Sequence, residues 1–254
     1  MTLLQLSLTG IFVFIPLLLS TYLKLGLEKD ILIATIRSTI QLFIIGYILT
    51  FVFESNHPLY ILLMILLMIT AATQNIIKKG EGIRGITWKI VVTLITVEAL
   101  TMGIMLTFNI IPFEARYVIP ISGMVIGNSM VLSLLFLNRF LSEIRNNHEQ
   151  IELILSLGGT NKQAIHQSLL SAIKSSMIPT IESQKTMGLV QLPGMMSGQI
   201  IGGADPIVAV QFQLLILFLL LTAATLSSVM VGFLSYPTLF NEKEQYLGEY
   251  QGTK

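Results

Sequence analysis

The sequence predicts an all-α integral membrane protein, on the basis of its apolar content, its few charged residues and its long uncharged runs. Of its 254 residues, 53% are hydrophobic and 11% are charged, and the mean hydropathy is +0.78. A soluble domain carries about a quarter charged residues, so this composition is typical of a chain that crosses a bilayer. We expect residues 1–254 to form a single transmembrane domain in the cell membrane (inner or plasma membrane).

Seven stretches are apolar enough to be membrane-spanning helices, since a span needs about 20 residues. The sixth is the weakest, because it is short and is interrupted by glycine and proline. The predicted spans cover residues 3–23, 31–53, 58–77, 87–109, 117–138, 186–204 and 210–234.

The basic residues predict the orientation of the chain. Every Lys and Arg except Arg37 and Arg116 falls on one side of the membrane if the N-terminus is outside, and cytoplasmic loops are the ones enriched in basic residues. The prediction is therefore N-out and C-in, with the long loop at about 139–185 in the cytoplasm. The net charge of +1 gives no indication of nucleic-acid binding, and the lack of cysteine excludes disulfides and thiolate metal sites.

The cytoplasmic loop is predicted to form a helix–glycine-turn–helix elbow. No Gly or Pro occurs from Asn128 through Leu157, so the fifth helix is expected to continue into the cytoplasm until Gly158-Gly159 stops it. Thr160 with Gln163 is a capping-box pattern for the next helix. In that helix an apolar residue recurs every four positions and should lie against the bundle, while Pro179 ends or kinks it. The apolar residues are Ile165, Leu169, Ile173 and Met177.

Ionisable residues inside spans are costly and indicate function by default. Glu98 lies in the middle of the fourth span and Arg37 lies about two turns into the second. They are predicted either to pair and fix two helices together or to contribute to a cation site, with Glu98 as the tentative metal ligand. Asn128, in the fifth span, is expected to make an interhelical hydrogen bond.

The sixth span is predicted either to be a tight packing face or to be a broken helix that gates a pathway. Pro193 removes a backbone donor, and Gly194 and Gly198 allow close approach of another helix. Methionine sulfur prefers soft metals, so Met195 and Met196 by themselves argue poorly for a site that binds a hard metal cation. The candidate translocation path comprises Arg37, Gln41, Glu98, Gln191, Met195, Met196 and Gln199, and the candidate helix break or gate comprises Pro193, Gly194 and Gly198.

The elbow resembles the loop of ABC-transporter permeases that docks onto the ATP-binding subunit, in which a glutamate precedes a glycine by six positions. Glu152 and Gly158 have this spacing, although the two alanines of the motif are Leu153 and Ile154 here and its distal Ile-x-Leu-Pro is absent. The resemblance implies that coupling to the ATPase subunit involves Glu152, Gly158, Gly159 and Thr160.

A wider resemblance covers essentially the whole chain. The stretches GLVQLPGMMSGQIIGGADPIVAVQFQ (188–213), IELILSLGGT (151–160) and IRSTIQLFIIGYIL (36–49) are similar to the FetB family, whose members are membrane subunits of a two-component ABC system implicated in iron export, with plant aluminium-tolerance permeases as relatives. The resemblance implies a partner ATPase that binds ATP and Mg, a homodimer of this permease in a two-plus-two assembly, and iron or another metal as substrate.

The residues themselves leave other functions open. The chain has no G-x-x-x-x-G-K-[ST] motif, so we expect it to bind no cofactor and to rely on its partner for ATP hydrolysis. An ABC permease for a phosphorylated sugar and a self-sufficient ion-coupled carrier using Glu98 are the alternatives. An intramembrane enzyme is disfavoured, because neither H-E-x-x-H nor a G-x-S-x-G with a membrane histidine is present.

Overall fold

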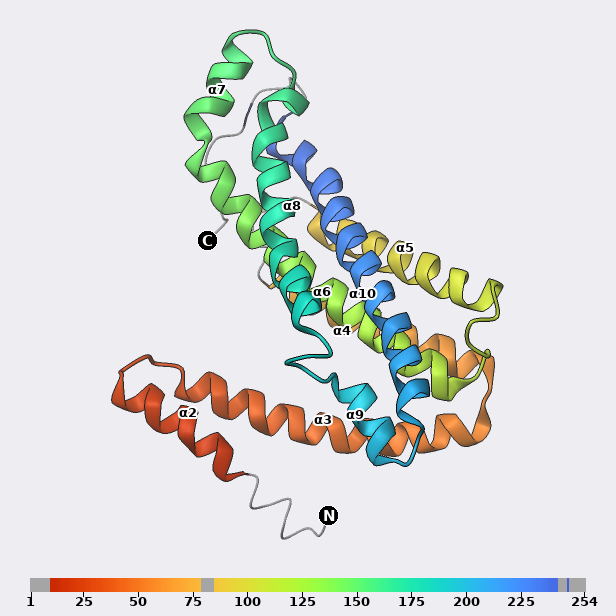
Figure 1. The fold of residues 1–254 in the computed structure, drawn as a ribbon. Coiled ribbons are helices and arrows are strands. Elements are labelled where there is room, and N and C mark those ends of the chain that lie inside the picture. Colours follow the sequence, from red (N-terminus) through yellow and green to blue (C-terminus); the bar gives the residue numbers. More distant parts are fainter. Residues whose placement is uncertain (1–9, 79–84, 242–245, 247–254) are drawn as a thin grey trace. The chain divides into compact units, whose positions relative to one another are not determined.

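The computed structural model describes residues 10–78, 85–241 and 246, which fold almost entirely into helices. Within these residues the only β-type pairings are isolated bridges. The chain divides into two compact units, with the boundary between His57 and Pro58. Figure 1 shows the helices of each unit.

The first unit consists of α2 (Ile11–Tyr22) and α3 (Glu28–Ser55), with α2 folded back on α3. The turn between them is fastened by Ser20. Its Oγ accepts a hydrogen bond from the Leu27 backbone N–H at 3.1 Å and donates to the Glu28 carboxylate at 2.8 Å. Gly26 has a φ of +72°, a conformation that favours glycine.

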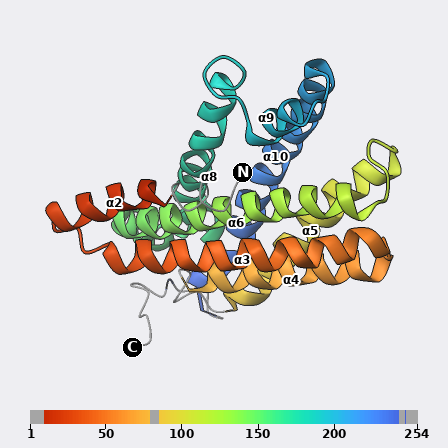
Figure 2. The ribbon, with the colours of Figure 1, turned by 90° about the horizontal axis from the view of Figure 1, so that it is seen from below.

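The second unit is built around α6 (Ala115–Asn146), which packs against α4 (Pro58–Ile77), α5 (Ile86–Thr107), α8 (Asn161–Thr186) and α10 (Pro206–Ser235). The helices α8 and α10 contact each other, and Figure 2 shows both on the same side of α6. The short helix α9 (Gly194–Ile201) contacts α10. The 3-10 helix η1 (Tyr236–Leu239) follows directly after α10. The apolar residues of these helices form two buried clusters.

The fifth predicted helix was expected to continue through Leu157, and the structure corrects this. The helix α6 ends at Asn146, and α7 (His148–Ser156) follows after a break at Asn147. The Asn147 side chain donates hydrogen bonds to the backbone carbonyl of Glu143 at 2.9 Å and to its carboxylate at 3.1 Å. An Asn side chain that bonds the backbone in this way competes with the hydrogen bonds of the helix and thereby interrupts it.

Five of the described helices are long and apolar enough to cross a membrane: α3, α4, α5, α6, and α10 with η1. Seven spans and the N-out orientation therefore stay predictions. The first predicted span begins at residue 3, outside the described residues, and its described part contains the 12-residue α2.

The sixth predicted span, 186–204, is not a continuous helix in the structure. The helix α8 ends at Thr186, an irregular segment follows, and α9 begins only at Gly194. Gly188 has a φ of +90°, and Pro193 both lacks an N–H and disfavours helix in the residue before it. The backbone chemistry of these residues thus prevents a helix that hydropathy alone would allow.

The predicted apolar face of the helix after the glycine turn is confirmed. Ile165 and Leu169 of α8 are buried in the larger apolar cluster, and Ile173 packs against it. The helix also continues through Pro179 to Thr186. Its last turns belong to the predicted cytoplasmic loop by sequence, yet they lie beside residues 128–135 in the middle of α6, within the predicted fifth span.

Candidate functional site

The turn between α7 and α8 is closed by two glycines that have different roles. Gly158 has a φ of +83°, and its N–H donates to the Leu155 carbonyl at 3.0 Å, while the Gly159 N–H donates to the Ile154 carbonyl at 2.9 Å. This pair of bonds is the Schellman termination of a helix. A Cβ at Gly159 would lie 2.8 Å from the Ile154 carbonyl oxygen, so this position needs glycine for close approach rather than for its φ.

The helix α8 begins with the capping box that the sequence predicts. The Thr160 Oγ1 accepts from the Gln163 N–H at 3.3 Å, and the Gln163 side chain accepts from the Thr160 N–H at 2.8 Å. The two residues thereby satisfy backbone donors that the first turn of a helix leaves without partners. The turn and the start of α8 are thus both specified by local sequence.

The helix α7 presents an unusual surface next to this turn. Leu153 and Leu157 are 58% and 79% exposed, and Glu152 beside them is exposed and pairs with His148 across 3.5 Å. Large apolar side chains around a charged residue on a protruding turn are typical of a protein contact surface. We call residues 152–160 the elbow surface.

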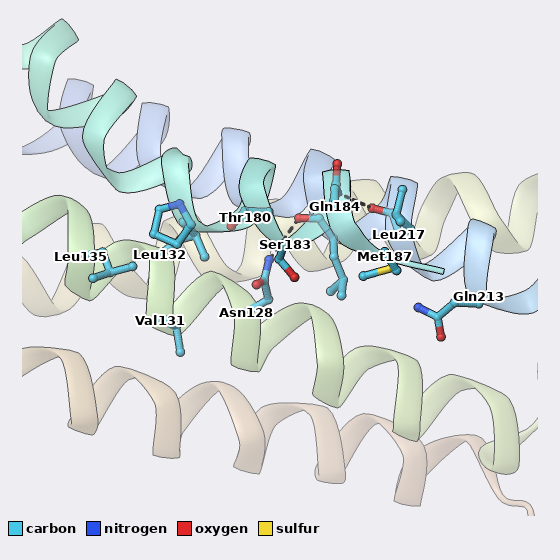
Figure 3. Close-up of a pocket in the computed structure, with 12 residues that line it drawn as sticks. Asn128, Val131, Leu132, Leu135, Thr180, Ser183, Gln184, Met187, Gln213 and Leu217 are labelled. Atoms are coloured by element: carbon cyan, nitrogen blue, oxygen red, sulfur yellow. Dashed lines mark hydrogen bonds between the residues drawn. The ribbon is translucent and has the colours of Figure 1, made fainter. Parts of the chain in front are cut away.

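The far end of α8 contributes to a pocket of about 260 Å³ with α6 and α10 (Figure 3). Its apolar lining comes from leucines and a valine of α6 and α10 and from Pro179. The pocket also has a polar lining drawn from all three helices. These polar residues are Asn128, Thr180, Ser183, Gln184 and Gln213, with the thioether of Met187 beside them.

Two of these amides tie the helices together. The Asn128 Nδ2 donates to the Leu220 carbonyl at 3.0 Å, and the Gln184 Nε2 donates to the Leu217 carbonyl at 3.3 Å (Figure 3). The predicted interhelical hydrogen bond of Asn128 is therefore confirmed. Both bonds reach carbonyls of α10, so α6 and α8 are fastened to the same stretch of one helix.

The predicted gate residues begin with an irregular segment after α8. Gln191 is exposed, its backbone carbonyl accepts from the Gly188 N–H at 2.9 Å, and its side-chain oxygen lies 3.5 Å from the Ser183 hydroxyl. Pro193 is the N-cap of α9. The helix break predicted at this proline is therefore present, and its action as a gate stays a prediction.

The helix α9 carries the remaining residues of the predicted path and gate. Met195 packs against the smaller apolar cluster, Met196 is half-buried, and the Gln199 Oε1 is buried without a hydrogen-bond partner among the described residues. Within the second unit, a Cβ at Gly194 or Gly198 would meet nothing within 4 Å. These glycines therefore pack against no helix of that unit, and a packing role for them stays a prediction.

The predicted intramembrane groups are divided between the two units. Glu98 of α5 is 6% exposed, and neither carboxylate oxygen has a partner with hydrogen-bond geometry among the described residues. Ser122 of α6 lies beside it, and its hydroxyl also lacks such a partner. Arg37 and Gln41 lie together on one face of α3, in the first unit. A pairing of Arg37 with Glu98 therefore stays a prediction.

The pocket contains none of the residues proposed from sequence for the translocation path. Single-sequence patterns indicate only fragments of it, because its polar groups come from three helices far apart in the chain. Those fragments are Asn128, which the sequence predicts to bond across helices, and the run Ser183-Gln184 at the end of an otherwise amphipathic helix. Among the described residues, no group of three His, Asp or Glu side chains is arranged to hold a metal ion.

The comparisons with known proteins cover nearly the whole chain. Residues 3–240 match an uncharacterised protein family, UPF0014. The chain belongs to the UPF0014 family. It is 59% identical over 242 residues to the UPF0014 membrane protein YjkA of Bacillus subtilis, covering 95% of this chain and 97% of that protein. No solved structure matches it.

Two other relatives, at lower identity, have names that describe a role. The protein named "Probable iron export permease protein FetB" of Escherichia coli is 37% identical over 95% of this chain and 93% of its own length. The protein ALUMINUM SENSITIVE 3 of Arabidopsis thaliana is 32% identical over 92% of this chain and 85% of its own length. With five apolar helices among its described residues, this UPF0014 chain is a multi-pass membrane protein and a membrane permease component.

Proposed function

We propose that this UPF0014 chain is the membrane subunit of an ABC transporter that exports a metal such as iron, energised by a separate ATP-binding subunit. The observation that carries the proposal is the similarity to a named iron export permease over 95% of the chain. In this proposal the chain itself hydrolyses nothing and acts as a homodimer with two ATPase subunits. The elbow surface is where the ATPase docks.

The geometry of the elbow surface supports docking. An ATPase subunit needs a rigid projection to grip, and the glycine turn and capping box fix α7 against the start of α8. Leu153 and Leu157 offer apolar anchors, and Glu152 offers a charge at the edge of the contact. Because α8 runs unbroken from this turn to the pocket, movement of the turn is transmitted to the middle of the bundle.

The first experiment is purification of the tagged chain from its native membranes in mild detergent, with identification of co-purifying proteins and an ATPase assay. We expect an ATP-binding subunit to co-purify and to be lost with Glu152→Lys or Gly158→Leu. Glu114→Lys, the same charge reversal at the N-cap of α6 and away from the elbow surface, is the matched control and should retain it. Gly158→Asn should also retain much of it, because Asn tolerates the left-handed conformation. A chain that purifies alone, without ATPase activity, contradicts the proposal.

A self-sufficient ion-coupled carrier is the second candidate function, because Glu98 is a buried carboxyl without a partner among the described residues. Such a group inside a span is a typical site of proton or cation binding. The carrier predicts transport by the purified chain in liposomes with no ATPase present. The ABC proposal predicts that this preparation is inactive until the ATPase subunit and ATP are added.

A further inference from the structure

The polar lining of the pocket between α6, α8 and α10 is rich in hydrogen-bond acceptors. A backbone carbonyl can only accept, so Asn128 and Gln184 must turn their NH₂ groups toward α10 to bond Leu220 and Leu217. Their amide oxygens then point away from α10, and no described residue donates to them. One N–H of each amide is thus in use, while both amide oxygens are free to accept.

Gln213 adds a third amide from α10 itself. Its side chain lines the pocket, the residue is only 9% exposed, and its Oε1 is buried without a partner among the described residues. The Oε1 itself has almost no accessible surface, so a cation in the pocket meets it only once the Gln213 side chain turns its oxygen into the cavity. Leaving a buried acceptor unpartnered costs about 1–3 kcal/mol, which favours that turn when a cation is bound. Thr180 and Ser183 of α8 supply further hydroxyl oxygens.

The pocket is electrically neutral. No Asp, Glu, Lys, Arg or His is among the residues that line it. The nearest charges along α8, Glu182 and Lys185, pair with each other across 2.7 Å and are exposed. Pro179 also lines the pocket and cannot donate to the carbonyl of Ser175, which leaves a backbone acceptor in that turn without its helical partner.

We propose that this pocket binds the transported metal cation through neutral oxygen ligands, chiefly the side-chain oxygens of Asn128, Gln184 and Gln213. The proposal rests on the proposed function, because it assigns a site to the metal that the transporter exports. Amide and hydroxyl oxygens suit hard cations. A volume of about 260 Å³ holds the cation together with part of its hydration shell, since a water occupies about 30 Å³.

The absence of a carboxylate from this lining fits transport better than storage. A transport site must bind well enough to admit the ion and weakly enough to release it. A phosphorylated sugar fits less well, because no lysine or arginine lines the pocket to balance the charge of its phosphate. The free amide oxygens and the lack of a basic side chain in the lining therefore favour a cation over an anion.

The test adds a charge to the pocket without removing a hydrogen bond that the structure contains. Gln213→Glu places a carboxylate at the unpartnered acceptor, Gln213→Leu removes the acceptor, and Gln211→Glu puts the same charge on the exposed opposite side of α10. Anaerobic calorimetry on the purified full chain would measure binding of Fe²⁺, with glucose 1-phosphate as the anionic probe.

We expect Fe²⁺ to bind about tenfold or more tightly to Gln213→Glu and about tenfold or more weakly to Gln213→Leu, on the scale typical of changes around a metal site. Gln211→Glu should match the wild type. If Gln213→Glu does not fold, Ser183→Asp delivers a carboxylate from α8 and decides the result. Wild-type chain that binds no Fe²⁺, pocket variants that leave its affinity unchanged, or glucose 1-phosphate bound in its place would overturn the site.

This outcome is separable from that of the proposed function. A co-purifying ATPase together with unchanged Fe²⁺ affinity in the pocket variants would keep the ABC permease and remove the site. A chain that purifies without an ATPase, but whose Fe²⁺ affinity rises in Gln213→Glu and falls in Gln213→Leu, would keep the site and remove the ATPase.

Discussion

The carboxylate of Glu143, near the end of α6, accepts a hydrogen bond from the hydroxyl of Ser171 on α8 across 2.9 Å. The other carboxylate oxygen accepts from Asn147, whose amide also lies 3.4 Å from Ser168 of α8. The helix break at Asn147 and the position of α8 therefore depend on the same side chain. Glu143 is a positioning residue between the elbow surface and the pocket.

Replacing Glu143 with Leu should uncouple ATP hydrolysis from transport. The variant loses the acceptors for Ser171 and Asn147, and a lost bond to a charged group costs about 1–3 kcal/mol. With α8 no longer fixed at its start, ATPase activity of the complex should persist while metal transport per ATP falls. The two rates measured on the same proteoliposomes check this.

The matched control is Glu149→Leu, because the exposed Glu149 side chain makes no hydrogen bond or ion pair among the described residues. It should leave the ratio of transport to hydrolysis at the wild-type value. Equal ratios in both variants would remove Glu143 from the coupling route.

Gly232→Ala should destabilise the bundle. A Cβ at Gly232 of α10 would lie 2.9 Å from the Leu169 Cδ1 and 3.0 Å from the Phe136 Cζ, where α6 and α8 meet α10. Overpacking of this kind costs about 1–3 kcal/mol. Thermal unfolding of the purified chain should show a lower midpoint than for the wild type.

A double variant tests whether this contact is the cause. Adding Leu169→Ala makes room beside the new methyl group, so the two substitutions together should cost less than the sum of their separate costs. Gly103→Ala, at a helical glycine where a Cβ meets nothing within 4 Å, should not lower the midpoint. Additive costs at Gly232 and Leu169 would contradict the steric explanation.

Gly159→Ala should weaken retention of the ATPase subunit although it leaves every exposed side chain of α7 unchanged. The new Cβ would collide with the Ile154 carbonyl oxygen, which accepts the bond that closes the turn. The variant therefore tests the geometry of the elbow surface separately from its side chains. Pull-down yield normalised to the amount of permease is the measurement, and unchanged yield would show that the turn geometry is dispensable.

The features that sequence predicts best here are those built from neighbouring residues. The glycine turn, the capping box at Thr160 and the buried face of α8 each depend on residues within a few positions of one another. Hydropathy does not predict where the helix of the sixth predicted span is interrupted, because it registers neither the positive φ of Gly188 nor the missing donor of Pro193. The break at Asn147 is equally local, since its hydrogen-bond partner is Glu143, but a single Asn in an otherwise helical pattern is not a reliable stop signal.

The pocket could not be predicted for a different reason. Asn128, Gln184 and Gln213 come from three helices, and the orientation of two of their amides is fixed by carbonyls of α10. No pattern within any one helix contains that information. By contrast, Glu98 was recognisable from sequence, because a carboxyl inside an apolar run is conspicuous by itself. It is buried on α5 and does not line the pocket.

Glu98→Gln distinguishes the two candidate cation sites. If the metal binds between α6, α8 and α10, the variant should bind Fe²⁺ with an affinity within about twofold of the wild type, because this amide has nearly the same shape as the carboxyl and lies outside the pocket lining. If Glu98 is the metal ligand, removing its charge should weaken Fe²⁺ binding about tenfold or more. Calorimetry on Glu98→Gln beside Gln213→Leu provides the comparison. A loss confined to Glu98→Gln would transfer the site to α5 and would favour the ion-coupled carrier.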